Sequence, residues 1–416
     1  MNKGMVAFCM VCLLVVGSMT AGCASGPALT VSAGDFHRHA TPVYVDLQRK
    51  VLDATTVACV ESDGHVAPAQ IEPLDDGRGR LWWILSDLPA GQTRTYTVKF
   101  CSACGDCRLP VFAWKDSSEG KIKSMDLMYG DRAVLRYMYT PYDGSSEEGI
   151  ELSKKPFHHV FDPDGSQLIT KGLGGKYPHH RGLFFAYNRI DTEGGPYDIW
   201  GGSHGDYQEH VKVVREMAGP VMGGHVVEIK WVNRHGVTLG VEKRRVVVFR
   251  SPTDEMLIEF TTTLEEGDKP VGMYSSNSHH GGVQFRAAQY VAEHEKETRY
   301  LRPAAWSHLP TDEQINTDKK KGGYVHKDLP WNALQYKLGD RAYTVAYLTD
   351  PANPGDADFS ERLYGRFGEY MPWDLRADHP LNLGYRWWIT ANKDTSREDV
   401  QLKYEDYAHP PTVTVD

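Results

Sequence analysis

The stretch Met256-Leu-Ile-Glu-Phe-Thr-Thr-Thr-Leu264 alternates apolar and polar side chains. Apolar residues at every second position, from Met256 to Phe260 and again at Leu264, fall on one face of an extended strand. Glu259, Thr261 and Thr263 fall on the other face. This period of two is typical of a strand that covers a hydrophobic core with one face only.

Two similar runs precede this stretch, His225 to Val232 and Val237 to Arg250. Polar turn residues separate the three runs, at Asn233-Arg-His-Gly236 and at Ser251-Pro-Thr-Asp254. Further upstream, Met125 to Tyr139 has the pattern of a hairpin that turns at Tyr129-Gly-Asp131. Successive strands joined by short turns favour antiparallel pairing.

Amphipathic helix patterns are scarce, so the sequence predicts an all-β protein. We expect a large antiparallel β-sandwich, supersandwich or jelly-roll-like, over residues 111–416. A small β-sandwich module over residues 29–110 should precede it. Its strand candidates are Val43–Leu47, Trp82–Leu85 and Tyr96–Phe100. Pro89–Gln92 supplies a turn between the last two.

The 416 residues include 46 basic and 55 acidic side chains, for a net charge of −9. A mildly acidic chain without a basic surface stripe is not expected to bind nucleic acid. The partner that composition leaves open is a small molecule or a glycan.

The first 23 residues have the pattern of a signal peptide, with Lys3 ahead of the short apolar run Met5 to Val16. The segment Thr20-Ala-Gly-Cys23 is similar to a bacterial lipobox, in which the cysteine is lipidated. We therefore expect export, with the protein periplasmic or anchored to the outer membrane through a lipid on Cys23. No later stretch is apolar enough to span a membrane, so the lipid would be its only membrane contact.

Four cysteines remain after the signal segment, Cys59, Cys101, Cys104 and Cys107. The spacing of the last three fits metal ligands, with Cys59 as a fourth. In an oxidising compartment two disulfides are the favoured interpretation.

Two glycine-flanked segments carry histidine pairs followed by arginine. Tyr177-Pro-His-His-Arg-Gly182 supplies His179, His180 and Arg181, and Ser276–Arg286 supplies His279, His280, Gln284 and Arg286. Imidazole beside guanidinium is typical of a general acid or base next to an anion-binding group. Structural histidines in two unrelated loops remain the alternative. Gln284 and Arg286 are two apart, so they should share a strand face.

A third segment adds Tyr364 and Glu369 as candidate proton-transfer groups and Arg366 as a charge-stabilising group. Residues that could bind a substrate around these segments are Asn188, Trp200, His210, Gln284 and Arg386. We expect the three segments to form walls of a single site.

Several runs resemble a bacterial family of exported proteins of unknown function often labelled "methane oxygenase PmoA-like". The matching runs cover residues 110–392 and include Lys155-Pro-Phe157, Asp162-Pro-Asp-Gly165, Thr170-Lys-Gly172, Tyr177–Gly182 and Tyr364-Gly-Arg-Phe367. The methane monooxygenase subunit is an integral membrane protein, so we do not expect this chain to be that subunit. Such families are common in bacteria rich in secreted sugar-degrading enzymes, which implies a carbohydrate ligand.

Together these features predict an exported carbohydrate-active enzyme that acts on an oligosaccharide or a uronic-acid-containing glycan. In a lyase, histidine or tyrosine would take the proton next to a carboxylate that arginine neutralises. A hydrolase is less favoured because it needs a pair of carboxylates. One alternative is a non-catalytic glycan-binding lipoprotein. The other is a histidine-ligated metal enzyme, in which a divalent metal would be the cofactor; otherwise we expect none.

Overall fold

The computed structural model describes residues 24–50, 57–74, 76–101, 110–202, 204–275, 280–314 and 327–416. The signal segment with Cys23, the cysteines Cys104 and Cys107, and His279 lie outside these ranges. Among the described residues, no helix is both long and apolar enough to cross a membrane.

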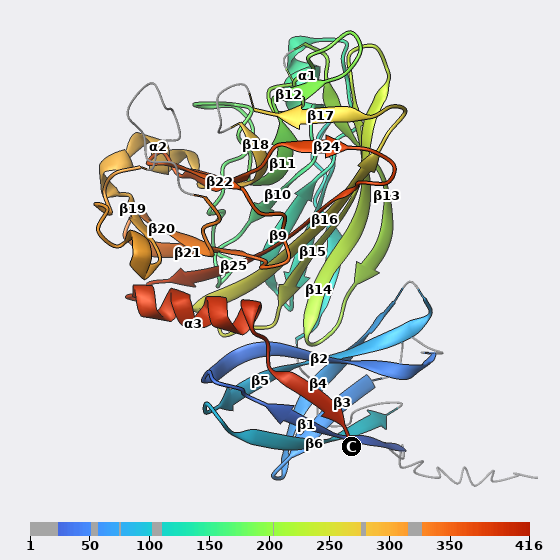
Figure 1. Cartoon of the computed structure of the whole chain (residues 1–416), viewed down its shortest axis with the longest axis vertical. Helices are drawn as coiled ribbons and strands as arrows, with labels where there is room; N and C mark the ends of the chain where they lie inside the picture. Colours follow the sequence, from blue (N-terminus) through green and yellow to red (C-terminus); the bar gives the residue numbers. More distant parts are fainter. Residues whose placement is uncertain are drawn as a thin grey trace, which may run out of the picture.

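The chain folds mostly into antiparallel β-sheets, which confirms the all-β prediction. Figure 1 shows a large sandwich in its upper part and a small β module below it, with the C-terminal segment running from the first into the second.

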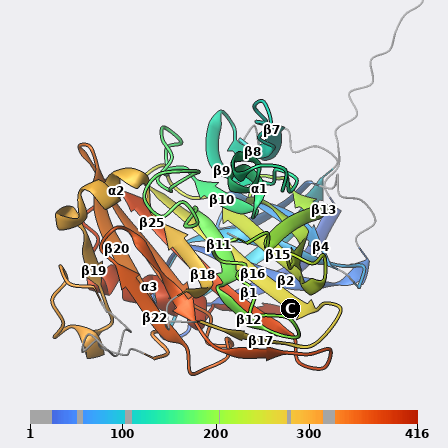
Figure 2. The ribbon, with the colours of Figure 1, turned by 90° about the horizontal axis from the view of Figure 1, so that it is seen from above.

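The first sheet of the sandwich has eight strands, and β18, β11, β10 and β9 follow one another across the molecule in Figure 2. In spatial order the strands are β22 (Asp358–Arg362), β23 (Arg366–Tyr370), β18 (Gly281–Arg286), β11 (Leu183–Tyr187), β10 (Phe157–Val160), β9 (Arg132–Met138), β8 (Ser124–Tyr129) and β7 (Phe112–Asp116). Strands β8 and β9 form the expected hairpin.

The second sheet also has eight strands and contains the stretch from which the sequence analysis began. In spatial order they are β13 (Tyr207–Met217), β14 (Met222–Val232), β15 (Thr238–Phe249), β16 (Glu255–Glu266), β25 (Leu381–Ala391), β21 (Arg341–Thr349), β20 (Trp331–Leu338) and β19 (Arg299–Leu301). The three runs predicted as successive strands are β14, β15 and β16, and they are neighbours in the sheet.

The core lies between these two sheets. Met256, Ile258 and Phe260 on β16 are all buried in it, as their alternation predicts. Aromatic rings join the sheets, since Phe185 packs 4.9 Å from Trp231. Burial of each large apolar side chain contributes about 1.5–3 kcal/mol. A three-stranded sheet lies at the end of the sandwich away from the small module; its strands are β12 (Arg189–Asp191), β17 (Val271–Tyr274) and β24 (Trp373–Leu375).

The small module is one seven-stranded sheet around its own core. Its strands are β2 (Arg38–Lys50), β5 (Arg78–Leu88), β4 (His65–Pro73), β3 (Val57–Ser62), β6 (Thr93–Cys101), β1 (Ala24–Ser32) and β26 (Thr412–Val415), in spatial order. The turn at Pro89–Gln92 joins β5 to β6, which do not pair with each other. Strand β26 comes from the far end of the chain and pairs with β1. The module's sheet therefore includes a segment that falls within the range 111–416 predicted for the sandwich.

Buried Cys59 lies on β3 and Cys101 ends β6, opposite Val57. Because Cys104 and Cys107 lie outside the described residues, the pairing of the four cysteines stays a prediction.

Three α-helices are described: α1 (Glu147–Ser153), α2 (Gln289–Glu293) and α3 (Arg397–Ala408). Helix α3 was not expected from the sequence. Its signal is a capping box, in which Ser396 and Asp399 each accept a backbone N–H of the other. Helix α3 packs against the second sheet above the small module, where Arg38 of the module pairs with Asp406 at 3.0 Å.

Candidate active site

Strand register gathers polar side chains on the face of the first sheet that points away from the second sheet. Arg286 of β18 lies opposite Arg366 of β23, and Gln284 lies two residues from Arg286 on the same face. The residues between them, Phe285 and Phe367, point to the core. Two arginines and an amide are thus buried side by side, although buried side chains are mostly apolar.

The loop that ends at Gly182 lays His180 over this face. Gly182 has a φ of +46°, and a Cβ at this position would lie 2.1 Å from the carbonyl oxygen of His158. Only glycine fits this approach without displacing β10. The glycine therefore fixes the path of the loop and the position of the imidazole before it.

His180 is the centre of an aromatic and imidazole cluster. Its ring lies 5.4 Å from Trp200, 6.0 Å from Tyr364 and 6.2 Å from His280, measured between ring centroids. The side chain is buried, yet neither ring nitrogen has a hydrogen-bond partner in the described part of the chain. Buried polar atoms in native proteins are nearly always bonded, so this imidazole has the features of a group that meets a ligand.

Arg286 is bonded on one side only. Its Nη1 donates to the carbonyl oxygens of Ala287 and Tyr364, the first at 2.9 Å. Its Nε and Nη2 have no partner among the described residues. The guanidinium carbon lies over the Tyr364 ring, 5.1 Å from its centre, so the aromatic ring packs against the guanidinium.

Arg366 is bonded only to neutral groups in the described residues. It donates to Oε1 of Gln284 at 2.7 Å, to Oγ of Ser360 at 3.0 Å and to Oη of Tyr364 at 3.3 Å. Gln284 thus holds the guanidinium that in turn holds the Tyr364 hydroxyl.

Two buried lysines that were not expected from the sequence hold the loop around His180. Lys171 donates to carbonyl oxygens of its own loop, including that of Gly172 at 3.1 Å. Lys155 donates to the carbonyls of His179 and Trp200. Both lysines lie in runs that carry the family resemblance, which is the signal that could have identified them.

Burial and the neighbouring cations set the protonation states. Burial, followed by the charges of Arg366 and Arg286, holds the pKa of His180 well below its usual value. Burial, followed by the charges of Lys155 and Lys154, lowers the pKa of His179 to about 3. Burial lowers the pKa of Lys171 to about 8. At neutral pH the imidazole of His180 is therefore uncharged. Burial, followed by the charge of Arg181, also holds the pKa of Lys155 well below its usual value.

Tyr177 covers this group from the solvent side. It is 40% exposed, and its ring lies 4.8 Å from Tyr364 and 5.6 Å from His180. Its φ of +57° is unusual for a residue with a side chain, and such backbone strain is most often found at functional sites.

Some predicted site residues point elsewhere. Arg181 turns away from His180 and pairs with Glu151 at 2.7 Å, which ties the loop to α1. Glu369 is three residues from Arg366 on β23, so it faces the second sheet, where it accepts a hydrogen bond from Oγ1 of Thr349 at 2.7 Å. Burial raises the pKa of Glu369 to about 8.

The predicted substrate-binding residues also divide. Trp200 and Gln284 touch the His180 group, and the backbone N–H of Asn188 donates to the carbonyl of His280 at 2.9 Å. His210 instead lies in a separate cluster, with Nδ1 3.0 Å from Oη of Tyr137. Arg386 lies on the outer face of the second sheet.

No three histidine, cysteine or carboxylate groups within the described ranges are arranged to hold a metal ion. The buried imidazoles of His158 and His225 form a second pair, with their Nε2 atoms 2.8 Å apart. This separation is a hydrogen bond between the two rings.

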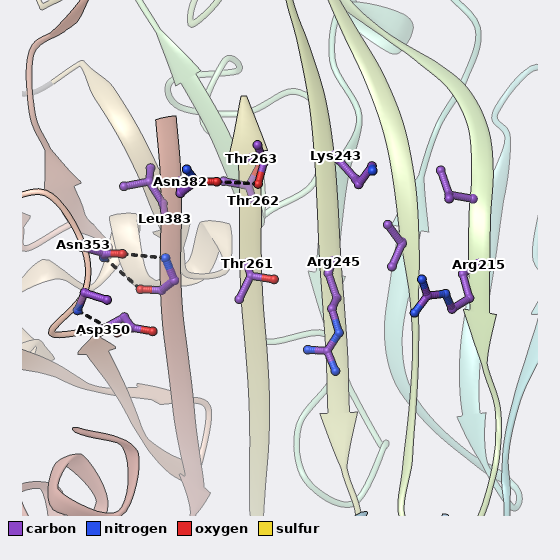
Figure 3. A pocket seen from close by; sticks show the side chains of 14 residues that line it. Arg215, Lys243, Arg245, Thr261, Thr262, Thr263, Asp350, Asn353, Asn382 and Leu383 are labelled. Carbon is purple, nitrogen blue, oxygen red and sulfur yellow. Dashed lines mark hydrogen bonds between the residues drawn. The ribbon is translucent and has the colours of Figure 1, made fainter. Parts of the chain in front are cut away.

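A cavity of about 400 Å³ lies on the outer face of the second sheet. Figure 3 shows Lys243 and Arg245 on β15 beside the threonines of β16 and Asn382 on β25. Its polar groups are largely satisfied by the chain itself, since Thr263 donates to Asn382 at 2.7 Å and Arg245 pairs with Glu259 at 2.7 Å. It lacks the unsatisfied buried atoms of the His180 group.

Comparison with known proteins gives a family and no activity. No curated protein matches the chain. Among solved structures, a GalM/aldose epimerase homologue from C. elegans is similar over 68% of this chain and 100% of its own, at 9% identity and a TM-score of 0.28. A family model described as "Family of unknown function (DUF6807)" matches residues 124–405, and that description carries no methane oxygenase label. The chain belongs to this family of unknown function.

Proposed function

We propose that this protein is an exported carbohydrate-active enzyme that transfers a proton on an oligosaccharide or a uronic-acid-containing glycan, in the manner of a lyase. The observation that carries the proposal is the buried, neutral imidazole of His180. Neither of its nitrogens is bonded to a described residue, and Arg286, Arg366 and Tyr364 surround it. A neutral imidazole next to cationic and hydroxyl groups is suited to general base catalysis.

His180 acts as the base in this scheme. It takes the proton from the carbon next to the substrate's carboxylate, and the electron pair of that C–H bond moves into the adjoining carbon–carbon bond. The positive charges around the site stabilise the negative charge that develops on the carboxylate. An anionic substrate also offsets the charge of Arg286, which raises the pKa of His180 and makes it a stronger base.

Tyr364 supplies the proton for the other half of the reaction. As the carbon–carbon double bond forms, the neighbouring carbon–oxygen bond to the next sugar breaks, and the departing oxygen takes the proton of the Tyr364 hydroxyl. Arg366 donates to that hydroxyl at 3.3 Å and stabilises the phenolate left behind. The proton taken by His180 returns to Tyr364 through solvent, so no further reactant is needed.

A hydrolase is less well supported. Of the carboxylates close to the loop, Glu151 is neutralised by Arg181 and Lys154. Glu369 faces the opposite side of the sheet. The carbohydrate part of the proposal rests on the family resemblance and on Trp200, Tyr364 and Tyr177. Such aromatic rings beside polar groups are common in sugar sites.

The test is a panel of neutral and uronic-acid-containing oligosaccharides, with ultraviolet absorbance reporting the new conjugated double bond. We expect turnover on a uronate-containing member, with and without chelator. His180→Ala should lower kcat about 100- to 10,000-fold. His37→Ala, on the surface of the small module, is the matched control and should be unchanged.

Other outcomes of this panel separate the alternatives. Full activity in His180→Ala removes that residue from the chemistry. Binding without turnover of any member favours the glycan-binding lipoprotein. Loss of activity with chelator, restored by a divalent metal, favours the metal enzyme.

A further inference from the structure

We infer that the Nε–Nη2 edge of Arg286 is a side-on receptor for the carboxylate of an acidic sugar, and that this contact sets the enzyme's preference for uronates over neutral sugars. The inference rests on the proposed function because it places the substrate in the same site.

The geometry of guanidinium suits this role. The N–H bonds of Nε and Nη2 are parallel and match the two oxygens of a carboxylate. In Arg286 the remaining nitrogen, Nη1, is held by the carbonyls of Ala287 and Tyr364. Because the side chain is 0% exposed and its plane rests on Tyr364, the Nε–Nη2 edge has a fixed direction.

The chain itself uses this edge to bind carboxylates. In six other arginines of the described residues the Nε and Nη2 atoms hold both oxygens of one carboxylate, at 2.6 to 3.3 Å. The pairs are Arg80 with Asp46, Arg136 with Asp126, Arg234 with Asp206, Arg244 with Glu242, Arg245 with Glu72 and Arg302 with Glu361. Arg286 presents the same edge, buried, with no described residue on it.

Charge balance points to the same ligand. Arg286 and Arg366 are buried side by side, and each donates only to neutral oxygens among the described residues. A buried cation without an anion is costly, and a ligand carboxylate would remove that cost. The proton transfer proposed for His180 needs a carboxylate beside the reacting carbon, so a planar carboxylate is favoured over phosphate.

The experiment measures binding and needs no turnover. We would titrate the full-length protein with galacturonate, glucuronate, galactose, glucose and inorganic phosphate, and follow ligand signals by nuclear magnetic resonance. The uronates should bind at least about 10-fold more tightly than the neutral sugars. Arg286→Gln should weaken uronate binding about 30-fold or more, because the carboxylate loses both donors in a buried site. Binding of the neutral sugars should change little.

Two variants control for charge and for folding. Arg286→Lys keeps a positive charge but loses the paired donors, so it should restore only part of the uronate affinity. Arg189→Gln removes an exposed arginine from β12 and should bind as the wild type does. Circular dichroism and the unfolding midpoint establish that Arg286→Gln is folded.

The outcomes separate this inference from the function it rests on. Arg286-dependent uronate binding with no turnover of any glycan supports the receptor and overturns the enzyme. Turnover of glycans with Arg286→Gln unchanged in both affinity and rate overturns the receptor and leaves the enzyme. Equal binding of uronates and neutral sugars overturns the receptor, as does Arg286-dependent binding of phosphate that matches that of the uronates.

Discussion

Each sheet of the sandwich carries a pair of arginines on its outer face, and the two pairs differ in what neutralises them. On the second sheet, Arg245 and Arg386 share the carboxylate of Glu259, at 2.7 and 2.8 Å. Arg245 also reaches Glu72 of the small module at 3.2 Å. On the first sheet, Arg286 and Arg366 donate only to neutral groups within the described residues.

The difference shows that a buried charge by itself does not mark a functional site. At the second sheet the chain supplies both signs of charge, and the resulting ion pairs help to join the small module to the sandwich. Around Arg286 and Arg366 the described residues supply no paired carboxylate, which leaves the opposite charge to a ligand. The identity of the partner, and not burial, separates the structural group from the candidate active site.

The largest effect on the stability of the fold should follow from removing the charge of Glu259, which pairs with both arginines of the second sheet. Glu259→Gln leaves the buried Arg386 and the partly buried Arg245 with less negative charge between them. Removing one partner of a buried pair costs about 3–5 kcal/mol. The midpoint of denaturant unfolding measures this loss.

Glu265→Gln on the same strand is the control, since Glu265 is exposed and should give the wild-type midpoint. If both variants unfold at the wild-type midpoint, the Glu259 pairs do not stabilise the fold and the contrast between the two sheets disappears.

Glu369 is the reverse case, a buried carboxyl for which no cation is paired in the described residues. Its pKa is raised to about 8, so the folded protein holds a proton that the unfolded chain has already lost at neutral pH. Stability from this group is fully present below the unfolded pKa, near 4.5, and is lost as the pH rises toward 8. The slope should be about 1.4 kcal/mol per pH unit at its steepest.

Unfolding of the wild type and of Glu369→Gln, compared from pH 5 to pH 8, isolates this contribution. The free energy of the variant should vary less with pH, because its amide does not titrate. Parallel pH profiles for the two proteins would mean that Glu369 is ionised in the fold.

The smallest effect on stability should come from replacing Arg286 on the first sheet, which has no carboxylate partner among the described residues. Arg286→Gln removes a buried charge together with two carbonyl contacts, and these effects oppose each other. The free energy of unfolding should therefore change by no more than about 1 kcal/mol. A loss as large as that expected for Glu259→Gln would show that Arg286 holds the fold together and would weaken its assignment to ligand binding.

The sandwich could be predicted because its strands carry a local signal. The alternation from Met256 to Phe260 follows from one buried face, and the turns after His225–Val232 consist of polar residues and glycine or proline. Strand β26 (Thr412–Val415) also alternates, but its place beside β1 could not be predicted because it depends on pairing between distant parts of the chain. Helix α3 has few apolar residues, and its sequence signal is the capping box formed by Ser396 and Asp399.

The candidate site was predictable where strand period applies. Gln284 and Arg286 share a face because they are two apart, and the same rule would have separated Arg366 from Glu369 had β23 been recognised as a strand. In the loop before Gly182 no period applies, so the opposite directions of His180 and Arg181 could not be read from spacing. The burial of Lys171 depends on packing of distant segments.

The most direct test of the account is a crystal structure of the protein bound to galacturonate. We expect both carboxylate oxygens within about 2.7–2.9 Å of Nε and Nη2 of Arg286, the separation usual for such charged pairs. The carbon next to the carboxylate should face the imidazole of His180. A carboxylate seated on Lys243 and Arg245 at the second sheet, with the edge of Arg286 untouched, would contradict the account.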